Sequence, residues 1–222
     1  MLDRAGSTTK VSVDDLTLAT PSVSDAAGWM CTVDVLWIPL GAGQHVVRIS
    51  GRAFEALTAL VQRRPARALY HSALVVTHDN GRHVIEMTPI SDGHGEERGV
   101  VAEGAVGTAW LGRFRVFRYE IHRWRNGVIP DADQAKSTTT LQLEPDDAQR
   151  LLDLVPSVPT PVWGRDDLDA GEMWNSNSVT SWILHSAGVD TAPLGPPDGG
   201  RAPGWNAGLV VAARTRDSAP CQ

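Results

Sequence analysis

The clearest helical pattern in the chain lies in residues 172–190, which read EMWNSNSVTSWILHSAGVD. Apolar side chains recur there at helical spacing, and Gly188 supplies a stop signal after the last of them. Ser176 lies three residues before Val179, on the same apolar stripe. The pattern therefore predicts an amphipathic helix that has Ser176 in its first turn, directed toward the core.

Strand-like runs dominate the first half of the chain, each bounded by turn residues. They lie at residues 30–40, 45–50, 69–77 and 83–90. Residues 41–44 are a turn between the first two, and Asp79-Asn80-Gly81 predicts a tight hairpin between the last two. A longer strand is expected over 111–124, with a bulge near Phe117 that reconciles a switch of parity.

Two further helices are expected from apolar spacing, one from residue 50 or 51 to Arg64 and one over 144–155. Residues 93–107 are predicted to be a loop, and 209–213 a last strand. Residues 1–28 are polar and aperiodic, which predicts a flexible tail, so that 29–222 form one domain. These elements together predict an α+β fold in which an antiparallel sheet packs against helices.

Composition narrows the classes of function without choosing one. The formal net charge of −6 over 222 residues argues against nonspecific nucleic-acid binding. No apolar run is long enough to span a membrane, and the first ten residues lack an export signal, so a cytoplasmic protein is expected. Cys31 and Cys221 have no ligand neighbours at metal spacing, so the sequence predicts no metal and no cofactor. The sequence makes no prediction of the oligomeric state.

Most of the remaining charged and aromatic groups allow two interpretations. The eight tryptophans either fill the core or line an apolar cleft. The arginines between 113 and 125 either coat a solvated strand face or bind an anionic ligand. Asp131 and Asp133 follow Pro130 and are interpreted as turn residues. Acidic residues between 166 and 172 either suggest a metal site or match the preference of a helix start for negative charge, and the second interpretation is preferred. They are Asp166, Asp167, Asp169 and Glu172.

Ser176 is the candidate nucleophile, although a serine at this position also serves as a helix cap. A serine hydroxyl needs a base to remove its proton, and His71 is the best candidate because it begins a buried strand. By alternation, His71 shares a face with Ala73 and Val75. Five of the other histidines are expected in solvated positions: His78, His83, His94, His122 and His185.

Glu86, a charged residue in an apolar strand, is the candidate that orients His71. If Asp79-Asn80 forms the two-residue loop, Glu86 stands opposite Ala73 and diagonal to His71. If Asn80-Gly81 forms the loop, Glu86 stands opposite Val75, too far away to contact His71. Both registers place the two side chains on one face of the sheet.

Three segments in this order resemble one known superfamily. They are LYHSALVV with His71, VIEMTP with Glu86, and NSNS with Ser176. The order resembles that of circularly permuted NlpC-like papain-fold proteins, which include relatives of lecithin retinol acyltransferase. The resemblance implies a permuted papain-like fold in which Ser176 stands at the nucleophile position, His71 is the base and Glu86 orients it. In that superfamily the nucleophile is usually a cysteine, whereas this chain has a serine.

Two functions are consistent with this interpretation. The first is a hydrolase or acyltransferase acting on an amide or ester of a small molecule or peptide, with Asn175, Asn177 and Trp174 at the oxyanion site and cleft. The second is a module that kept the cleft, lost covalent chemistry and binds a ligand or peptide. Trp174 and Trp182 would then line the cleft. The sequence does not name the substrate.

Overall fold

The computed structural model describes residues 31–40, 67–90 and 99–217. The predicted tail over 1–28, strand over 45–50 and helix over 50–64 lie outside these ranges. The described residues form a six-stranded antiparallel sheet and three α-helices, which confirms the α+β prediction.

The sheet has the strand order β4-β5-β3-β2-β1-β6. Its strands are β1 (Cys31–Pro39), β2 (Tyr70–His78), β3 (Gly81–Pro89), β4 (Val100–Ala105), β5 (Arg118–Arg125) and β6 (Ser137–Leu143). Every pair of neighbouring strands is antiparallel. The strands expected over 30–40, 69–77 and 83–90 are confirmed as β1, β2 and β3.

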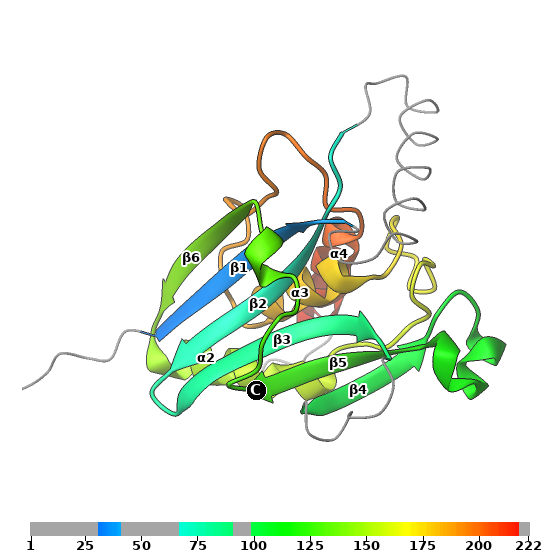
Figure 1. Cartoon of the computed structure of the whole chain (residues 1–222), viewed down its shortest axis with the longest axis horizontal. Helices are drawn as coiled ribbons and strands as arrows, with labels where there is room; N and C mark the ends of the chain where they lie inside the picture. The colour runs from blue at the N-terminus through cyan, green and yellow to red at the C-terminus, as the bar shows by residue number, and fades with distance from the viewer. Residues whose placement is uncertain (1–30, 41–66, 91–98, 218–222) are drawn as a thin grey trace, which may run out of the picture.

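The three α-helices lie behind the sheet in Figure 1: α2 (Pro145–Leu154), α3 (Ser176–Ser186) and α4 (Trp205–Asp217). The main core lies between this helical layer and the sheet, and it includes Trp37, Leu74 and Ile183. A smaller second core cluster lies on the opposite face of the sheet: Leu36, Ile38, Ala73, Val75, Val84 and Ile129. The connection from β5 to β6, which contains Ile129, crosses that face in Figure 1.

Three sequence predictions are wrong. Residues 111–117 are not strand but two 3₁₀ turns, η2 (Ala109–Arg113) and η3 (Arg115–Phe117), in which no residue is buried. The loop predicted over 93–107 contains β4. The strand predicted over 209–213 belongs to α4, because a short apolar run does not by itself distinguish a buried strand from a buried helix.

Strand β6 was missed because it carries a weak signal. Its sequence STTTLQL is mostly polar and its side chains are alternately exposed and half-buried, as expected at the edge of a sheet. Helix α2 was predicted correctly and begins after Glu144, although no side chain caps it.

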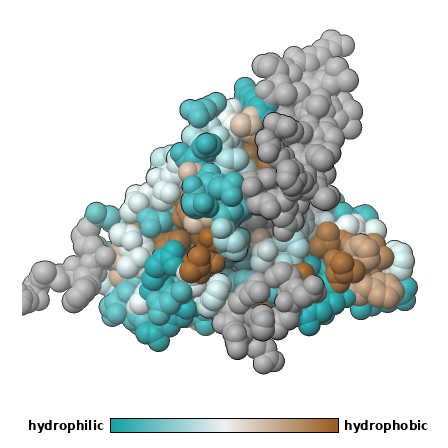
Figure 2. Space-filling view, viewed as in Figure 1, coloured by the Kyte–Doolittle hydropathy of each residue, from teal (hydrophilic) through white to brown (hydrophobic). Residues whose placement is uncertain are grey.

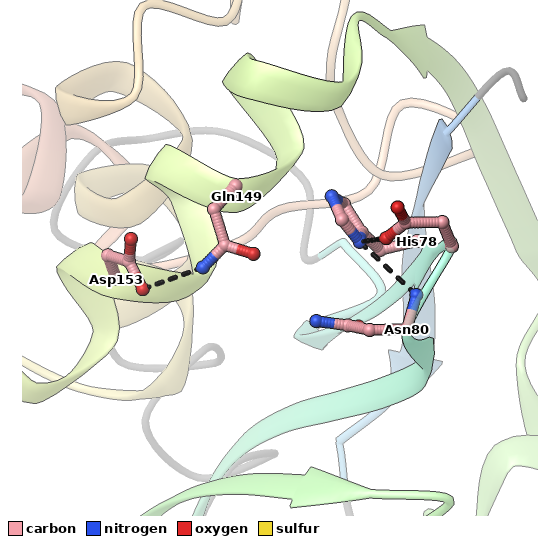
Figure 3. Close-up of polar contacts among 5 residues, drawn as sticks. His78, Asn80, Gln149 and Asp153 are labelled. Atoms are coloured by element: carbon pink, nitrogen blue, oxygen red, sulfur yellow. Dashed lines mark hydrogen bonds and ion pairs between the residues drawn. The ribbon is translucent and has the colours of Figure 1, made fainter. Parts of the chain in front are cut away.

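The hairpin between β2 and β3 closes with a two-residue loop, Asp79-Asn80, because His78 pairs with Gly81. Gly81 takes a positive φ of 124°, which explains the glycine after the loop. Figure 3 shows this closed end beside α2, where Gln149 donates to Asp153 at 2.9 Å, and His78 contacts the Asn80 N–H and the Asp79 carboxylate. The two contacts of His78 stabilise the turn, whereas the bond from Gln149 to Asp153 lies within α2.

At the other end of the hairpin the two strands separate. The β2–β3 pairing stops at Leu74 and Ile85, whereas β2 stays paired with β1 as far as Tyr70. Strand β3 stays paired with β5 as far as Pro89. We call the opening between residues 70–73 and 86–89 the fork, and Figure 1 shows the two strands diverging there.

Candidate functional site

The first turns of α3 are hydrogen-bonded to the part of β2 that no longer pairs with β3. The Asn177 side chain donates to the Tyr70 carbonyl oxygen at 3.0 Å, and the Thr180 hydroxyl donates to the Ser72 carbonyl oxygen at 3.4 Å. The Ser72 hydroxyl in turn donates to Asn177 Oδ1 at 2.9 Å. Backbone groups in a protein interior need partners, so α3 supplies those that β3 would have given. These bonds fix the backbone on both sides of His71.

Asn175, not Ser176, caps the helix. The Asn175 side chain accepts from the N–H groups of Asn177 and Ser178, and the Ser178 hydroxyl accepts from the Asn175 N–H in return. This reciprocal arrangement is a capping box. The interpretation of Ser176 as a plain cap is therefore wrong.

The amides of Asn175 and Asn177 are committed to structural hydrogen bonds. Both side chains donate to the Pro203 carbonyl oxygen, at 2.8 and 2.9 Å, in addition to their bonds within α3 and to β2. Neither amide is free to stabilise an oxyanion as the sequence predicted.

Ser176 stands apart from its neighbours in the NSNS sequence. It occupies the first position of α3 and is 6% exposed, so it is buried close to the surface. Among the described residues, neither its hydroxyl nor its N–H has a hydrogen bond, whereas Asn175, Asn177 and Ser178 all have several. An N–H at the start of a helix carries partial positive charge. As far as the described residues go, Ser176 therefore offers an unbonded hydroxyl and an unbonded N–H donor at one point.

His71 forms a hydrogen bond with Asp131. Its Nε2 lies 3.3 Å from Asp131 Oδ2, and both side chains are partly accessible. The hydrogen bond from His71 is the main cause that holds the pKa of the Asp131 carboxyl below its usual value. Asp131 was interpreted as a turn residue. The missed signal is Ile129 two residues earlier, which is buried in the second core cluster and fixes the loop over β2.

This hydrogen bond sets the tautomer of the His71 ring. An ionised carboxylate only accepts hydrogen bonds, so Nε2 must carry the proton. In the neutral imidazole, Nδ1 is then an acceptor with a free lone pair. The His71–Asp131 pair therefore has the form of an oriented general base.

Ser176 and His71 are not hydrogen-bonded to each other, and β2 links their positions. Since consecutive Cα atoms are about 3.8 Å apart, the bond from Asn177 to Tyr70 brings the Ser176 Cα within roughly 10 Å of the Tyr70 carbonyl oxygen. His71 shares its sheet face with Ala73 and Val75, as predicted, and α3 packs against the other face.

Glu86 lies in one of the two positions that the sequence predicts for it. The Asp79-Asn80 loop places it opposite Ala73 and diagonal to His71, which was one of the two expected registers. The β2–β3 pairing ends before this point, however, and the residue paired with Glu86 is His122 on β5. The hydrogen bond of His71 goes to Asp131, which makes Asp131 a second candidate for the residue that orients the ring.

Trp174 and Trp182 are core residues, not cleft walls. They are 2% and 3% exposed and belong to the main core between α3 and the sheet. The prediction that Trp174 and Trp182 line a cleft is therefore wrong.

His122 is another correction, since it was expected in solvent. It is 3% exposed, and its Nε2 lies 3.0 Å from Oε2 of Glu120, which is 4% exposed. Both side chains alternate with Tyr119 and Ile121, which face the main core, so they belong to the opposite face of β5. The sheet face that carries His71 thus also carries a buried acid–imidazole pair.

Within the described ranges, no three His, Cys, Asp or Glu side chains form a group that could hold a metal ion. The part of the chain that the structure describes also contains no helix with the length and apolarity needed to cross a bilayer. Comparisons with protein-family models, curated proteins and solved structures give no significant match.

Proposed function

We propose that this chain is a papain-like hydrolase or acyltransferase that acts on an amide or ester bond, with Ser176 as nucleophile, His71 as base and Asp131 as the residue that orients the base. The proposal rests on the hydrogen bond between His71 and Asp131. His71 lies on β2, to which the first turns of α3, beginning at Ser176, are hydrogen-bonded. The substrate is a small molecule or a peptide, met in the cytoplasm.

The reaction begins when the Ser176 oxygen attacks the carbonyl carbon and passes its proton to His71 Nδ1. The carbonyl oxygen becomes an oxyanion, which the Ser176 N–H and the positive end of α3 stabilise. Asp131 remains ionised and stabilises the imidazolium through Nε2. When the tetrahedral intermediate collapses, the leaving amine or alcohol takes the proton from His71, and the acyl group remains on Ser176.

The second half of the reaction depends on the acceptor. Water attacks the acyl ester in a hydrolase, and an acceptor alcohol or amine attacks it in an acyltransferase. His71 accepts the proton of the attacking group and returns it to the Ser176 oxygen. The two activities share one acyl-enzyme, so a covalent probe tests both.

A fluorophosphonate probe with mass-spectrometric site mapping is the direct test. We expect labelling of Ser176 in the wild type and none in Ser176→Ala. The labelling rate should fall by about 100-fold or more in His71→Ala and in Asp131→Asn. The matched control is Asp133→Asn, an exposed carboxylate two residues along the same loop, which should label like the wild type.

The same assay separates the two candidates for the orienting residue. Glu86→Gln should label at close to the wild-type rate. A folded wild type that does not label would overturn the proposal. Slow labelling in Glu86→Gln with normal labelling in Asp131→Asn would overturn the assignment of Asp131.

The second candidate function is a ligand- or peptide-binding module, which the absence of a Ser176–His71 hydrogen bond among the described residues favours. The variant Ser176→Cys distinguishes the two. In a working site, Nδ1 of His71 and the start of α3 lower the thiol pKa, so this cysteine should alkylate at neutral pH much faster than the buried Cys31. An equally slow thiol supports the binding module.

A further inference from the structure

The two 3₁₀ turns between β4 and β5 carry an unusual set of exposed side chains. Of the five exposed large apolar residues among the described residues, four lie here: Trp110, Phe114, Val116 and Phe117. Trp110 is 60% exposed and Val116 is 77% exposed. We call residues 109–117 the tip. They form one end of the molecule, at the right of Figure 1, and appear as a brown patch in Figure 2.

The tip has an ordered backbone. The N–H of Phe114 donates to the Leu111 carbonyl at 2.9 Å, and the N–H of Phe117 donates to the Phe114 carbonyl at 2.9 Å. Gly112 packs so tightly on β4 that an added Cβ would lie 2.7 Å from the Ala105 Cβ. The apolar side chains are therefore held outward by a fixed scaffold, which lowers the entropic cost of binding.

The tip is also positively charged. The Arg113 guanidinium lies over the rings of Trp110 and Phe114, 4.8 and 5.1 Å from their centroids. Arg115 is exposed, and within the described residues neither Arg113 nor Arg115 forms an ion pair. The segment holds no acidic residue, in a chain with a net charge of −6. Its chemistry therefore suits an anionic partner with an apolar interior.

A lipid bilayer fits this shape better than a protein does. A specific protein interface takes about 800 Å² and 20 to 30 residues from each partner, whereas the tip has only the nine residues from Ala109 to Phe117. A projecting segment that inserts aromatic side chains between headgroups needs no such area. Tryptophan and arginine both favour the membrane interface, with an apolar body in lipid and a polar end in water.

We infer that the tip attaches this protein peripherally to membranes rich in anionic phospholipid, with Trp110 and Val116 inserted and Arg113 and Arg115 on the headgroup phosphates. This attachment is independent of the Ser176 chemistry. Since each arginine near an anionic surface contributes separately, binding should weaken as salt screens the charges.

Vesicle flotation of the full chain tests the inference, with phosphatidylcholine vesicles and with vesicles that contain phosphatidylglycerol. The wild type should float with the anionic vesicles and much less with the neutral ones. Arg113→Ala/Arg115→Ala should lower the partition coefficient about 30-fold. Trp110→Ser/Val116→Ser should lower it about tenfold or more.

Two matched controls keep the test specific to the tip. Val128→Ser removes the fifth exposed large apolar side chain of the described residues, and Arg216→Ala removes an exposed arginine elsewhere. Both should float like the wild type. Failure of the wild type to float, or equal loss in tip and control variants, would overturn the inference. Sedimentation that shows self-association abolished by Trp110→Ser would also overturn it, in favour of a second copy as the partner.

Discussion

Asn177 and Ser176 are neighbours in the chain but have different roles in the structure. Asn177 is 2% exposed and uses both ends of its amide to join α3 to β2 and to the segment before α4. The Ser176 hydroxyl and N–H make no hydrogen bond with the described residues. A buried polar group that loses its partners costs more than a group that never had them. Substitution of Asn177 should therefore lower the stability of the fold, whereas substitution of Ser176 should abolish reactivity and leave stability nearly unchanged.

We expect Asn177→Ala to destabilise the protein by roughly 2 to 4 kcal/mol, because it leaves the Tyr70 carbonyl and the Ser72 hydroxyl without partners. Ser176→Ala should change the free energy of unfolding by less than about 0.5 kcal/mol. Urea denaturation followed by circular dichroism measures both. A large loss in Ser176→Ala would mean that its hydroxyl has a structural role.

The cap of α3 gives a second comparison at the residue scale. Asn175→Ala should cost about 1 to 2 kcal/mol, since it removes the acceptor for two N–H groups. Asn175→Asp keeps an acceptor at the cap but loses the donor to Pro203, so it should recover part of that loss. If both variants matched the wild type in urea denaturation, the capping box would not contribute to stability.

At the scale of elements, the position of the site depends on how closely α3 and α4 approach. Gly208 of α4 lies against α3, where an added Cβ would come within 2.1 Å of both the Ser178 carbonyl oxygen and the Ser181 hydroxyl. Ser181 also donates to the Trp205 carbonyl oxygen at 2.7 Å. The absence of a side chain at Gly208 therefore permits the contact that holds the first turn of α3 at the fork.

Gly208→Ala should destabilise the protein by about 1 to 3 kcal/mol, because the helices must separate to admit the methyl group. It should also slow labelling of Ser176 by the fluorophosphonate probe. Gly195→Ala is the control, since nothing lies within 4 Å of a Cβ added there. A thermal unfolding midpoint unchanged in Gly208→Ala would show that the two helices pack less tightly than these distances indicate.

At the scale of the whole molecule, Asp131 in the loop from β5 to β6 makes the stability of the fold depend on pH. Asp131 has a lowered pKa in the folded state, chiefly through the hydrogen bond from His71. A carboxyl whose folded pKa is lowered contributes stability above its unfolded pKa and loses it as the pH falls through the folded value. The unfolded value is about 3.9 for an aspartate.

The stability difference between the wild type and Asp131→Asn should therefore be constant above about pH 5 and shrink below about pH 4. Urea unfolding from pH 3 to pH 7 measures it, with Asp133→Asn as control. A difference that stays constant down to pH 3 would show that the pKa of Asp131 is not lowered in the folded protein.

Sequence alone determined the elements whose periodicity is strong and local. The helix with Ser176 in its first turn, the strand that begins at His71 and the Asp79-Asn80-Gly81 turn were each readable, because their side chains alternate or recur within a few residues. Tip residues 111–117 were misread as strand, since apolar residues that face solvent have the same local pattern as buried ones.

Only the tertiary structure decided what those elements do together. Asp131 meets His71 across sixty positions of sequence, and Asn177 meets Tyr70 across 107, so no local pattern could pair them. The fork exists because the pairing of β2 with β3 ends at Leu74 and Ile85, and α3 supplies hydrogen-bond partners for the β2 backbone beyond that point. Hydrogen-bond partners are set by the packing of distant segments, and for that reason the partner of His71 and the bonds of the Asn175 and Asn177 amides could not be predicted from the sequence.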